Sequence, residues 1–307
     1  MAATPILHPA LHPVILETTG FADYRLLDSG NGRKLECFGN MTLVRPEEQA
    51  IWSPRLDEAA WGKADAVFTG AIDEEGAGRW KRKADTPEAW NCAHGSIRFI
   101  CRLTSFRHVG AFPEQAAHWA WMTKRLADAS ADGRQPRLLN LFGYTGLASL
   151  IAAQAGAHVT HVDASKKAIG WARENQSLSG MDNKPIRWIC DDAMKFVARE
   201  VRRGNTYDGI VLDPPKFGRG PKGETWDLFA DLPGMLRQCR ELIDRKSGFV
   251  ILTAYAIRAS FIALHELMAE ILGPGVESGE LVLLEESRDG RPGRRLPTSL
   301  LARWPAG

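Results

Sequence analysis

Residues 137–163 read RLLNLFGYTGLASLIAAQAGAHVTHVD, and this stretch decides the fold. The apolar run at residues 137–142 predicts a buried strand, and the glycines of residues 143–146 predict a tight turn. Residues 147–155 predict a helix that is closed by a glycine. Residues 158–163 then predict a second strand. A strand, a turn, a helix and a strand in this order indicate a parallel α/β sheet.

The glycine turn has the features of a nucleoside-binding site. Gly143 and Gly146 let a ligand approach the backbone close to the free N–H groups of the following helix. Asp163 ends the next strand, about 20 residues further on, where such folds bind a ribose diol. The turn lacks the full Gly-x-Gly-x-x-Gly pattern that makes room for a pyrophosphate. It therefore suits a cofactor with an amino-acid tail better than a nicotinamide or flavin dinucleotide.

A second feature is the sequence DPPKF at residues 213–217, which follows an apolar run, YDGIVL, at residues 207–212. The run predicts a buried parallel strand. The two prolines have no N–H group to continue the strand ladder, so they form a stiff corner with Asp213 at its base. Ligands of open α/β sheets bind at this end of the strands. The corner suits a planar nitrogenous group and favours methyl transfer over hydride transfer.

Together, residues 140–146 (NLFGYTG) and 213–217 (DPPKF) resemble class I S-adenosylmethionine-dependent methyltransferases. Within that class they resemble the branch that contains the ribosomal RNA large-subunit cytosine-C5 methyltransferases. Residues 110–115 (GAFPEQ) are also similar to that branch, in which a Gly-x-Phe segment precedes the cofactor domain. The resemblance covers about residues 96–307. It implies S-adenosyl-L-methionine as the cofactor and RNA as the partner.

The resemblance also implies which residues contact the cofactor. The turn would face the methionine portion, Asp163 would accept hydrogen bonds from the ribose hydroxyls, and an acid with a small residue would contact the adenine. For that acid we favour Asp192 over its neighbour Asp191. The implied cofactor-binding residues are Gln115, Asn140, Leu141, Phe142, Gly143, Tyr144, Thr145, Gly146, Asp163, Ala164, Asp192 and Ala193.

The catalytic residues implied by the resemblance are Asp213, Pro214, Pro215, Lys216 and Phe217. We expect Asp213 to accept a hydrogen bond from an amino nucleophile or from the cofactor's ammonium, and the Pro214 carbonyl to accept another. Phe217 would stack on a flat base, as aromatic side chains do on single-stranded nucleic acid. Lys216, Arg219 and Lys222 make the Gly-rich loop after the corner basic, which suits either contact with a phosphate or a solvated loop.

One departure from the cytosine-C5 branch concerns cysteine. Methylation of a pyrimidine at carbon 5 requires a cysteine that adds covalently to the ring. Relatives carry it at the end of the fifth strand, and other pyrimidine-C5 enzymes carry it after the Pro-Pro corner. Residues 252–258 (LTAYAIR) and 215–217 (PKF) contain none. We therefore expect methylation of nitrogen or oxygen, with loss of activity as the alternative.

The predicted fold is a Rossmann-like, seven-stranded, mostly parallel sheet with helices on both faces and an antiparallel edge hairpin. It occupies residues 96–307. Residues 1–95 predict a small β-rich accessory domain, because two short strands at residues 24–28 and 33–38 flank a Ser-Gly-Asn-Gly turn. This domain does not match the PUA-type module of the relatives residue by residue, and its role stays open.

Composition limits the class of protein. A length of 307 residues suits two domains, and a net charge of +2 gives no global basic field. Five scattered cysteines without a Cys-x-x-Cys pair argue against a disulfide framework or a metal site and favour a cytoplasmic location. The Pro- and His-rich residues 1–13 do not predict a signal peptide. No apolar run approaches the roughly 18 residues of a membrane span.

These observations predict a cytoplasmic S-adenosylmethionine-dependent methyltransferase that acts on RNA, with ribosomal RNA favoured. The alternatives are a methyltransferase of a protein or small molecule, and a non-catalytic scaffold that binds cofactor or RNA. A scaffold would bind the cofactor and never release S-adenosylhomocysteine. A second basic cluster, at residues 288–295, suits either an RNA-gripping hairpin tip or a solvated turn. The oligomeric state stays open.

Overall fold

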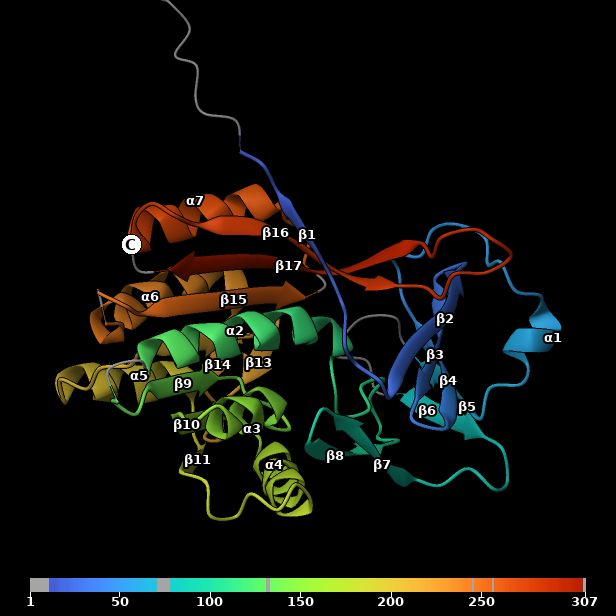
Figure 1. The fold of residues 1–307 in the computed structure, drawn as a ribbon, viewed down its shortest axis with the longest axis horizontal. Helices are drawn as coiled ribbons and strands as arrows, with labels where there is room; N and C mark the ends of the chain where they lie inside the picture. Colours follow the sequence, from blue (N-terminus) through green and yellow to red (C-terminus); the bar gives the residue numbers. More distant parts are fainter. Residues whose placement is uncertain (1–10, 71–77, 131–132, 245, 256, 306–307) are drawn as a thin grey trace, which may run out of the picture.

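The computed structural model describes residues 11–70, 78–130, 133–244, 246–255 and 257–305. Most of the Pro- and His-rich segment for which we expected no signal peptide lies outside these residues. The main element is a sheet with the strand order β1-β16-β17-β15-β12-β9-β10-β11 (Figure 1). Its strands are β1 (Val14–Glu17), β9 (Arg137–Leu141), β10 (His158–Asp163), β11 (Ile186–Cys190), β12 (Gly209–Leu212), β15 (Phe249–Tyr255), β16 (Glu277–Leu284) and β17 (Arg295–Pro305).

The predicted Rossmann-like fold is confirmed, with one addition. The strands β9, β10, β11, β12 and β15 are parallel, and β17 pairs antiparallel with both β15 and β16. These are the seven expected strands. The eighth, β1, pairs parallel with β16, so it covers the edge that the terminal hairpin would otherwise form. A short strand can add to an exposed edge because the edge offers unpaired backbone groups.

Helices cover both faces of this sheet (Figure 1). One face carries α2, α3 and α4, and the other carries α5, α6 and α7, as their mutual contacts show. Their bounds are α2 (Ala116–Ala129), α3 (Leu147–Gln154), α4 (Lys166–Leu178), α5 (Ala193–Arg202), α6 (Leu228–Leu242) and α7 (Phe261–Leu272). A 3-10 turn (Pro113–Gln115) precedes α2, and the hairpin of β13 (Phe217–Arg219) and β14 (Thr225–Asp227) follows the Pro-Pro corner.

The N-terminal region is β-rich, as expected. It holds a five-stranded sheet and a separate hairpin of β7 (Ala89–His94) and β8 (Ile97–Arg102). The sheet consists of β2 (Tyr24–Gly30), β3 (Arg33–Phe38), β4 (Met41–Pro46), β5 (Ala66–Gly70) and β6 (Gly78–Arg82), with the short helix α1 (Glu58–Trp61) between β4 and β5. The predicted boundary between residues 95 and 96 falls in the β7–β8 turn and stays a prediction.

A shared core joins this region to the large sheet. Phe38 and Leu43 of the N-terminal strands belong to the same buried cluster as Trp119 of α2 and Leu138 of β9. The two regions therefore bury apolar surface against each other, which fixes the position of the N-terminal strands beside the carboxyl ends of the parallel strands.

The basic cluster at residues 288–295 divides into two parts. Arg294 forms ion pairs with Glu285 at 2.8 Å and with Asp28 of β2 at 2.9 Å. Both carboxylates are buried, with side chains 2% and 1% exposed. Arg294 therefore ties the β16–β17 hairpin to the N-terminal sheet, whereas the nearby Arg291 is exposed.

Substitution of Arg294 by Ala is expected to lower the free energy of unfolding by about 3 kcal/mol, because it removes the nearest cation from two buried carboxylates and leaves Glu285 only the more distant Arg55, at 4.0 Å. Chemical denaturation would measure the loss, provided that the unfolding free energy depends on denaturant concentration with the same slope in the variant and the wild type. Arg291→Ala is the matched control and should change stability by less than about 0.5 kcal/mol. Equal losses of stability in the two variants would show that Arg294 does not stabilise the contact between the β16–β17 hairpin and the N-terminal sheet.

Among the residues described, no helix is both long enough and apolar enough to cross a membrane.

Candidate active site

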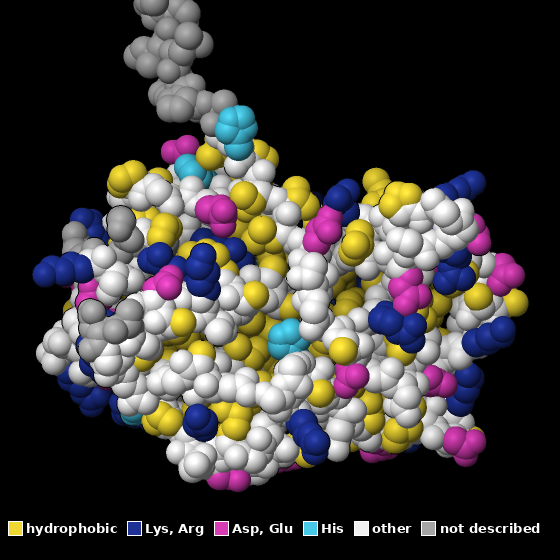
Figure 2. Space-filling view, viewed as in Figure 1, with side chains coloured by type: hydrophobic (Ala, Val, Ile, Leu, Met, Phe, Trp, Pro, Cys, Tyr) yellow, Lys and Arg dark blue, Asp and Glu magenta, His cyan; other side chains and the backbone are white. Residues whose placement is uncertain are grey.

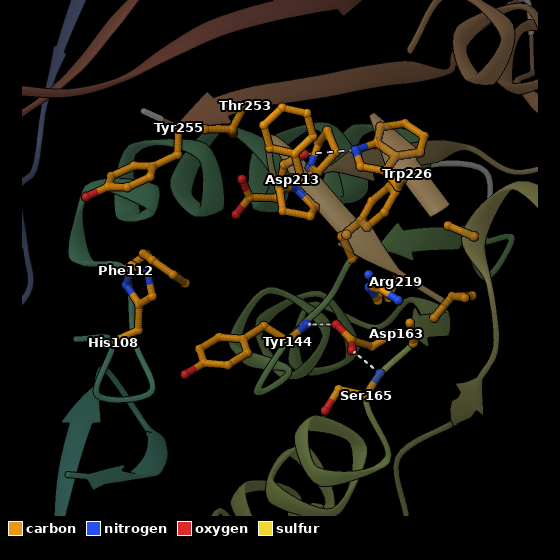
Figure 3. Close-up of a pocket in the computed structure, with 18 of the residues that line it drawn as sticks. His108, Phe112, Tyr144, Asp163, Ser165, Asp213, Arg219, Trp226, Thr253 and Tyr255 are labelled. Carbon is orange, nitrogen blue, oxygen red and sulfur yellow. Dashed lines mark hydrogen bonds between the residues drawn. The ribbon is translucent and has the colours of Figure 1, made fainter. Parts of the chain in front are cut away.

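A cavity of about 400 Å³ opens at the carboxyl ends of the parallel strands, beside the N-terminal region. This volume falls in the range of small-molecule and cofactor sites. Figure 2 shows apolar side chains and a histidine in a hollow near the middle of this face. Figure 3 shows the side chains that point into the cavity from the ends of β10, β12 and β15 and from the turn before α3.

The turn between β9 and α3 is held in an uncommon backbone conformation. Phe142 and Tyr144 have φ angles of 58° and 50°, in the left-handed region that residues other than glycine rarely adopt. The Tyr144 N–H donates to Asp163 Oδ2 at 2.8 Å, and the Gly143 N–H donates to the Val162 carbonyl at 3.1 Å. The end of β10 thus holds the strained turn against the cavity, and such strain often marks a functional site.

Asp163 lies at the end of β10, between the turn and the start of α4. Its Oδ1 accepts from the Ser165 N–H at 2.8 Å, so each carboxylate oxygen already holds one backbone group (Figure 3). Burial raises the pKa of Asp163 above its usual range, although these two N–H groups oppose the shift. A carboxylate accepts about four hydrogen bonds, so two acceptor positions remain for a pair of hydroxyl groups.

The two acids after β11 have different surroundings. Asp192 lines the cavity, and its Oδ1 accepts from the Lys195 N–H at 2.9 Å, which caps α5. The Asp191 carboxylate instead forms an ion pair with Arg199, and Asp191 does not line the cavity. The geometry therefore favours Asp192 as the acid that faces a ligand.

The Pro-Pro corner is fixed from two sides. Gln115 Nε2 donates to Asp213 Oδ2 at 3.1 Å, and Gln115 Oε1 accepts from Thr253 Oγ1 at 3.4 Å. On the other side, the Trp226 indole N–H donates to the Pro215 carbonyl at 2.8 Å. These contacts fix the Asp213 carboxylate and the Pro215 carbonyl, which is the preorganisation that a reaction by placement needs.

The cavity brings together eleven of the predicted site residues, namely Gln115, Phe142, Tyr144, Asp163, Ala164, Asp192, Ala193, Asp213, Pro214, Pro215 and Phe217. Three others, Asn140, Gly143 and Thr145, line a smaller adjoining cavity. Leu141, Gly146 and Lys216 line neither cavity. The roles of all these residues stay predictions.

The residues outside the main cavity have other contacts. The Asn140 amide donates to Ser149 Oγ at 2.9 Å, and that hydroxyl contacts His161 Nδ1 at 2.9 Å. Burial lowers the pKa of His161 to about 3, so this ring is neutral behind the turn. Thr145 Oγ1 donates to the Gly110 carbonyl at 2.6 Å. Lys216 Nζ lies 5.1 Å from the centroid of the Phe217 ring.

The cavity also contains residues that the motifs did not single out as site residues. His108, Trp226 and Ser299 come from three separate parts of the chain and follow no pattern in the sequence. Phe112 and Glu114 also line the cavity. They lie in the GAFPEQ segment, so that segment was the sequence feature from which these two site residues could have been predicted.

Gly146 begins α3 with a φ of 83°, and a Cβ there would lie 2.9 Å from both Ala172 Cβ and the Trp188 ring. Gly146→Ala is therefore expected to lower the free energy of unfolding by about 2–4 kcal/mol, from backbone strain and overpacking together. The matched control is Gly156→Ala, because Gly156 has a φ of 96° but a Cβ added to it would meet nothing within 4 Å. Thermal denaturation should show a larger loss for Gly146, and equal losses would contradict the close packing of the turn.

None of the five cysteines lines either cavity within the described part of the chain. Cys239 is buried in α6, and burial raises the pKa of its thiol to about 12. Cys190 is exposed at the end of β11, and its Sγ lies 3.6 Å from the Ala164 carbonyl. A thiolate nucleophile therefore does not face the Pro-Pro corner.

Comparisons with known proteins agree with this geometry. Residues 42–270 match a family model described as S-adenosylmethionine-dependent methyltransferase. The crystal structure of a SAM-dependent methyltransferase from Agrobacterium tumefaciens is similar to this chain, with 54% sequence identity and a TM-score of 0.91. The match covers 100% of this chain and 98% of that protein's chain. A methyltransferase-like structure in complex with SAH has a TM-score of 0.67 at 18% identity, and therefore shows the fold alone.

Curated relatives are more distant and longer. A ribosomal RNA large subunit methyltransferase K/L from Syntrophotalea carbinolica is 28% identical over 200 residues, which are 64% of this chain and 27% of the relative. A ribosomal RNA large subunit methyltransferase K from Neisseria meningitidis serogroup B is 26% identical over 226 residues, which are 70% of this chain and 59% of the relative. The chain thus spans less than two thirds of either relative.

Proposed function

Because the chain belongs to the S-adenosylmethionine-dependent methyltransferase family, we propose that it transfers a methyl group directly to a nitrogen or oxygen atom of RNA, with ribosomal RNA as the favoured substrate. One observation carries this proposal. A single cavity joins the acid at the end of β10 to the rigid Pro-Pro corner at the end of β12, and no cysteine lines it in the described residues.

The residues present fit the cofactor. Asp163 keeps two acceptor positions for the ribose hydroxyls, and Asp192 with Ala193 would face the adenine. The strained turn of Phe142 and Tyr144 would lie against the methionine portion. When bound, S-adenosylmethionine supplies a methyl group that its sulfonium makes electrophilic.

The chain's own contribution is placement of the nucleophile. Gln115 orients the Asp213 carboxylate, which would accept a hydrogen bond from an amino group of the substrate. The Pro214 carbonyl would accept a second hydrogen bond and Phe217 would stack on a flat base. An exposed fraction of 45% leaves the Phe217 ring accessible for this contact. Orientation of this kind contributes several kcal/mol of barrier lowering without covalent catalysis.

The choice of nitrogen or oxygen follows from the cysteines. Carbon-5 methylation of a pyrimidine needs a covalent thiolate adduct, and neither the corner nor the end of β15 supplies one. The names of the curated relatives support RNA as the substrate. Arg219 at the cavity, with Lys222 nearby, supports contact with the phosphate backbone. The five free cysteines support a cytoplasmic location.

Transfer of radiolabelled methyl groups into unmodified large-subunit ribosomal RNA, transcribed in vitro, tests the proposal. We expect label in the RNA that ribonuclease releases and protease does not. An Asp182→Asn variant, altered at an exposed position that lines neither cavity, should label as the wild type does. Label that survives ribonuclease, or cofactor binding without label, would contradict an RNA substrate.

A further inference from the structure

The side of the cavity away from Asp163 has aromatic walls (Figure 3). The His108 and Phe112 ring centroids are 5.0 Å apart, and the Tyr255 centroid lies 6.1 Å from His108 and 6.3 Å from Phe112. Tyr144 from the turn lies 5.6 Å from Phe112 and completes the group. We call the space that these four rings and Glu114 line the aromatic compartment.

Glu114 gives this compartment a polar group. It lines the cavity but is only 4% exposed, and no described residue forms an ion pair with its carboxyl group. Burial raises the pKa of Glu114, although Lys34, the residue's own backbone N–H and Arg45 oppose the shift. A carboxyl group has more acceptor positions than this one N–H fills, and unfilled positions are costly when they are buried. The Glu114 carboxyl group therefore suits a ligand that donates a hydrogen bond.

The N-terminal strands hold the compartment in place. Arg107 Nη2 donates to the Tyr255 hydroxyl at 3.4 Å, and its guanidinium lies 5.6 Å from the Tyr255 ring centroid. Arg45 in β4 donates to the Arg107 carbonyl at 3.2 Å. Arg45 itself is fixed by two hydrogen bonds to the fully buried Glu36, at 2.7 and 2.9 Å. A rigid wall of this kind reduces the cost of ordering a bound ring.

We propose that the aromatic compartment receives one unpaired base of single-stranded RNA, stacked against His108, Phe112 and Tyr255, with Glu114 accepting a hydrogen bond from an N–H group of the base. This inference rests on the proposed function and names the part of the substrate that the site reads. Aromatic faces take up any flat base, and a buried carboxyl group discriminates in favour of bases with an N–H edge. A base within a duplex cannot reach such a compartment unless it is flipped out.

The compartment suits a base better than a phosphate. Its walls are aromatic rings and a carboxyl group, and a carboxylate repels a phosphate at close range. Among the described residues that line this cavity, Arg219 is the one Lys or Arg, and it lies on the other side, near Asp163 (Figure 3). Arg107 contacts the Tyr255 hydroxyl but does not line the cavity. The phosphates of a bound strand are therefore expected outside the aromatic compartment.

Binding measurements can isolate the base from the backbone. Fluorescence anisotropy would compare a labelled, short single-stranded RNA of random sequence with an abasic ribose-phosphate chain of equal length. The protein would be saturated with S-adenosylhomocysteine, so that the cofactor end is blocked. We expect the random RNA to bind about tenfold more tightly than the abasic chain, as one stacked base contributes about 1–3 kcal/mol.

Variants assign this difference to the compartment. Tyr255→Leu and Glu114→Leu should each remove most of the preference for random RNA, with unchanged affinity for the abasic chain and for S-adenosylhomocysteine. Tyr255→Phe keeps the ring and should retain the preference. Glu241→Gln, at an exposed position on α6, is the control and should bind as the wild type does. Unchanged cofactor affinity would show that each variant is folded.

Equal binding of random RNA and the abasic chain would overturn the inference, and so would variants that keep the wild-type preference. The proposed function fails differently, by the absence of methyl label in RNA. If the wild-type enzyme labels RNA but shows no base preference, the proposed function holds and the base-binding role of the aromatic compartment is wrong. If it prefers bases but does not label RNA, the base-binding role holds and the proposed function is wrong.

Discussion

Substitution of Asp163 by Asn is expected to weaken S-adenosylmethionine binding about 100-fold, which corresponds to about 2.7 kcal/mol. Hydrogen bonds from two hydroxyl groups to a charged acceptor contribute about 1.5–3 kcal/mol each, and the amide loses the charge. The amide also presents an NH₂ group to either the Tyr144 or the Ser165 N–H, both of which donate to Asp163. The strained turn would therefore lose part of its support.

Isothermal titration with S-adenosylmethionine would measure this effect. Asp191→Asn is the matched control, because Asp191 pairs with Arg199 and does not line the cavity. It should bind the cofactor within about threefold of the wild type. An Asp163 variant that binds normally, or an Asp191 variant that is equally impaired, would refute the assignment of the ribose-binding acid.

The same site has an expected pH dependence. Ribose binding favours the ionised form of Asp163, and burial raises the pKa of this group above the usual Asp range. Cofactor affinity should therefore be constant at neutral pH and fall as the pH decreases through this raised pKa. The Asp163→Asn variant should show no such fall, and an identical fall in both proteins would assign it to another group.

The second large effect is expected at the Pro-Pro corner. Asp213→Asn should lower the rate of methyl transfer at saturating cofactor by at least about 100-fold, since misplacement of a nucleophile by about 1 Å has this consequence. The amide can present its NH₂ group to Gln115 Nε2, which now donates to the carboxylate at 3.1 Å. It also removes an acceptor for the amino group of the substrate.

Single-turnover transfer of labelled methyl groups would measure the rate, and titration would measure cofactor affinity. We expect cofactor affinity to stay within about threefold of the wild type, which would assign Asp213 to the nucleophile. A parallel loss of affinity and rate would instead assign it to the cofactor's ammonium group. A wild-type rate would remove Asp213 from the catalytic residues.

Local sequence order was sufficient to predict the parallel sheet and the terminal hairpin. The seven predicted strands of the large sheet have their signals within their own residues, so periodicity and glycine positions place them in order. The β13–β14 hairpin after the Pro-Pro corner was not predicted, because its strands have three residues each. The pairing of β1 with β16 had no such signal, because its partner comes from the opposite end of the chain. A four-residue apolar segment is too short for periodicity to identify as a strand.

The site was predictable where a motif ends a strand, as at Asp163 and Asp213. It was less predictable within the motif, because the strand ends inside it. Leu141 is the last residue of β9 and lies in the core, whereas Phe142 begins the turn with a φ of 58° and lines the cavity. His108 reaches the cavity only through tertiary packing, so no motif could have indicated it.

The most direct test of direct methyl transfer to RNA is the identity of the product. Unmodified large-subunit ribosomal RNA would be incubated with the enzyme and S-adenosylmethionine, digested to nucleosides and analysed by mass spectrometry against standards. The account predicts a nucleoside methylated on a base nitrogen or on an oxygen. A 5-methylcytidine or 5-methyluridine product would contradict it, because that chemistry requires the cysteine nucleophile that the site does not present.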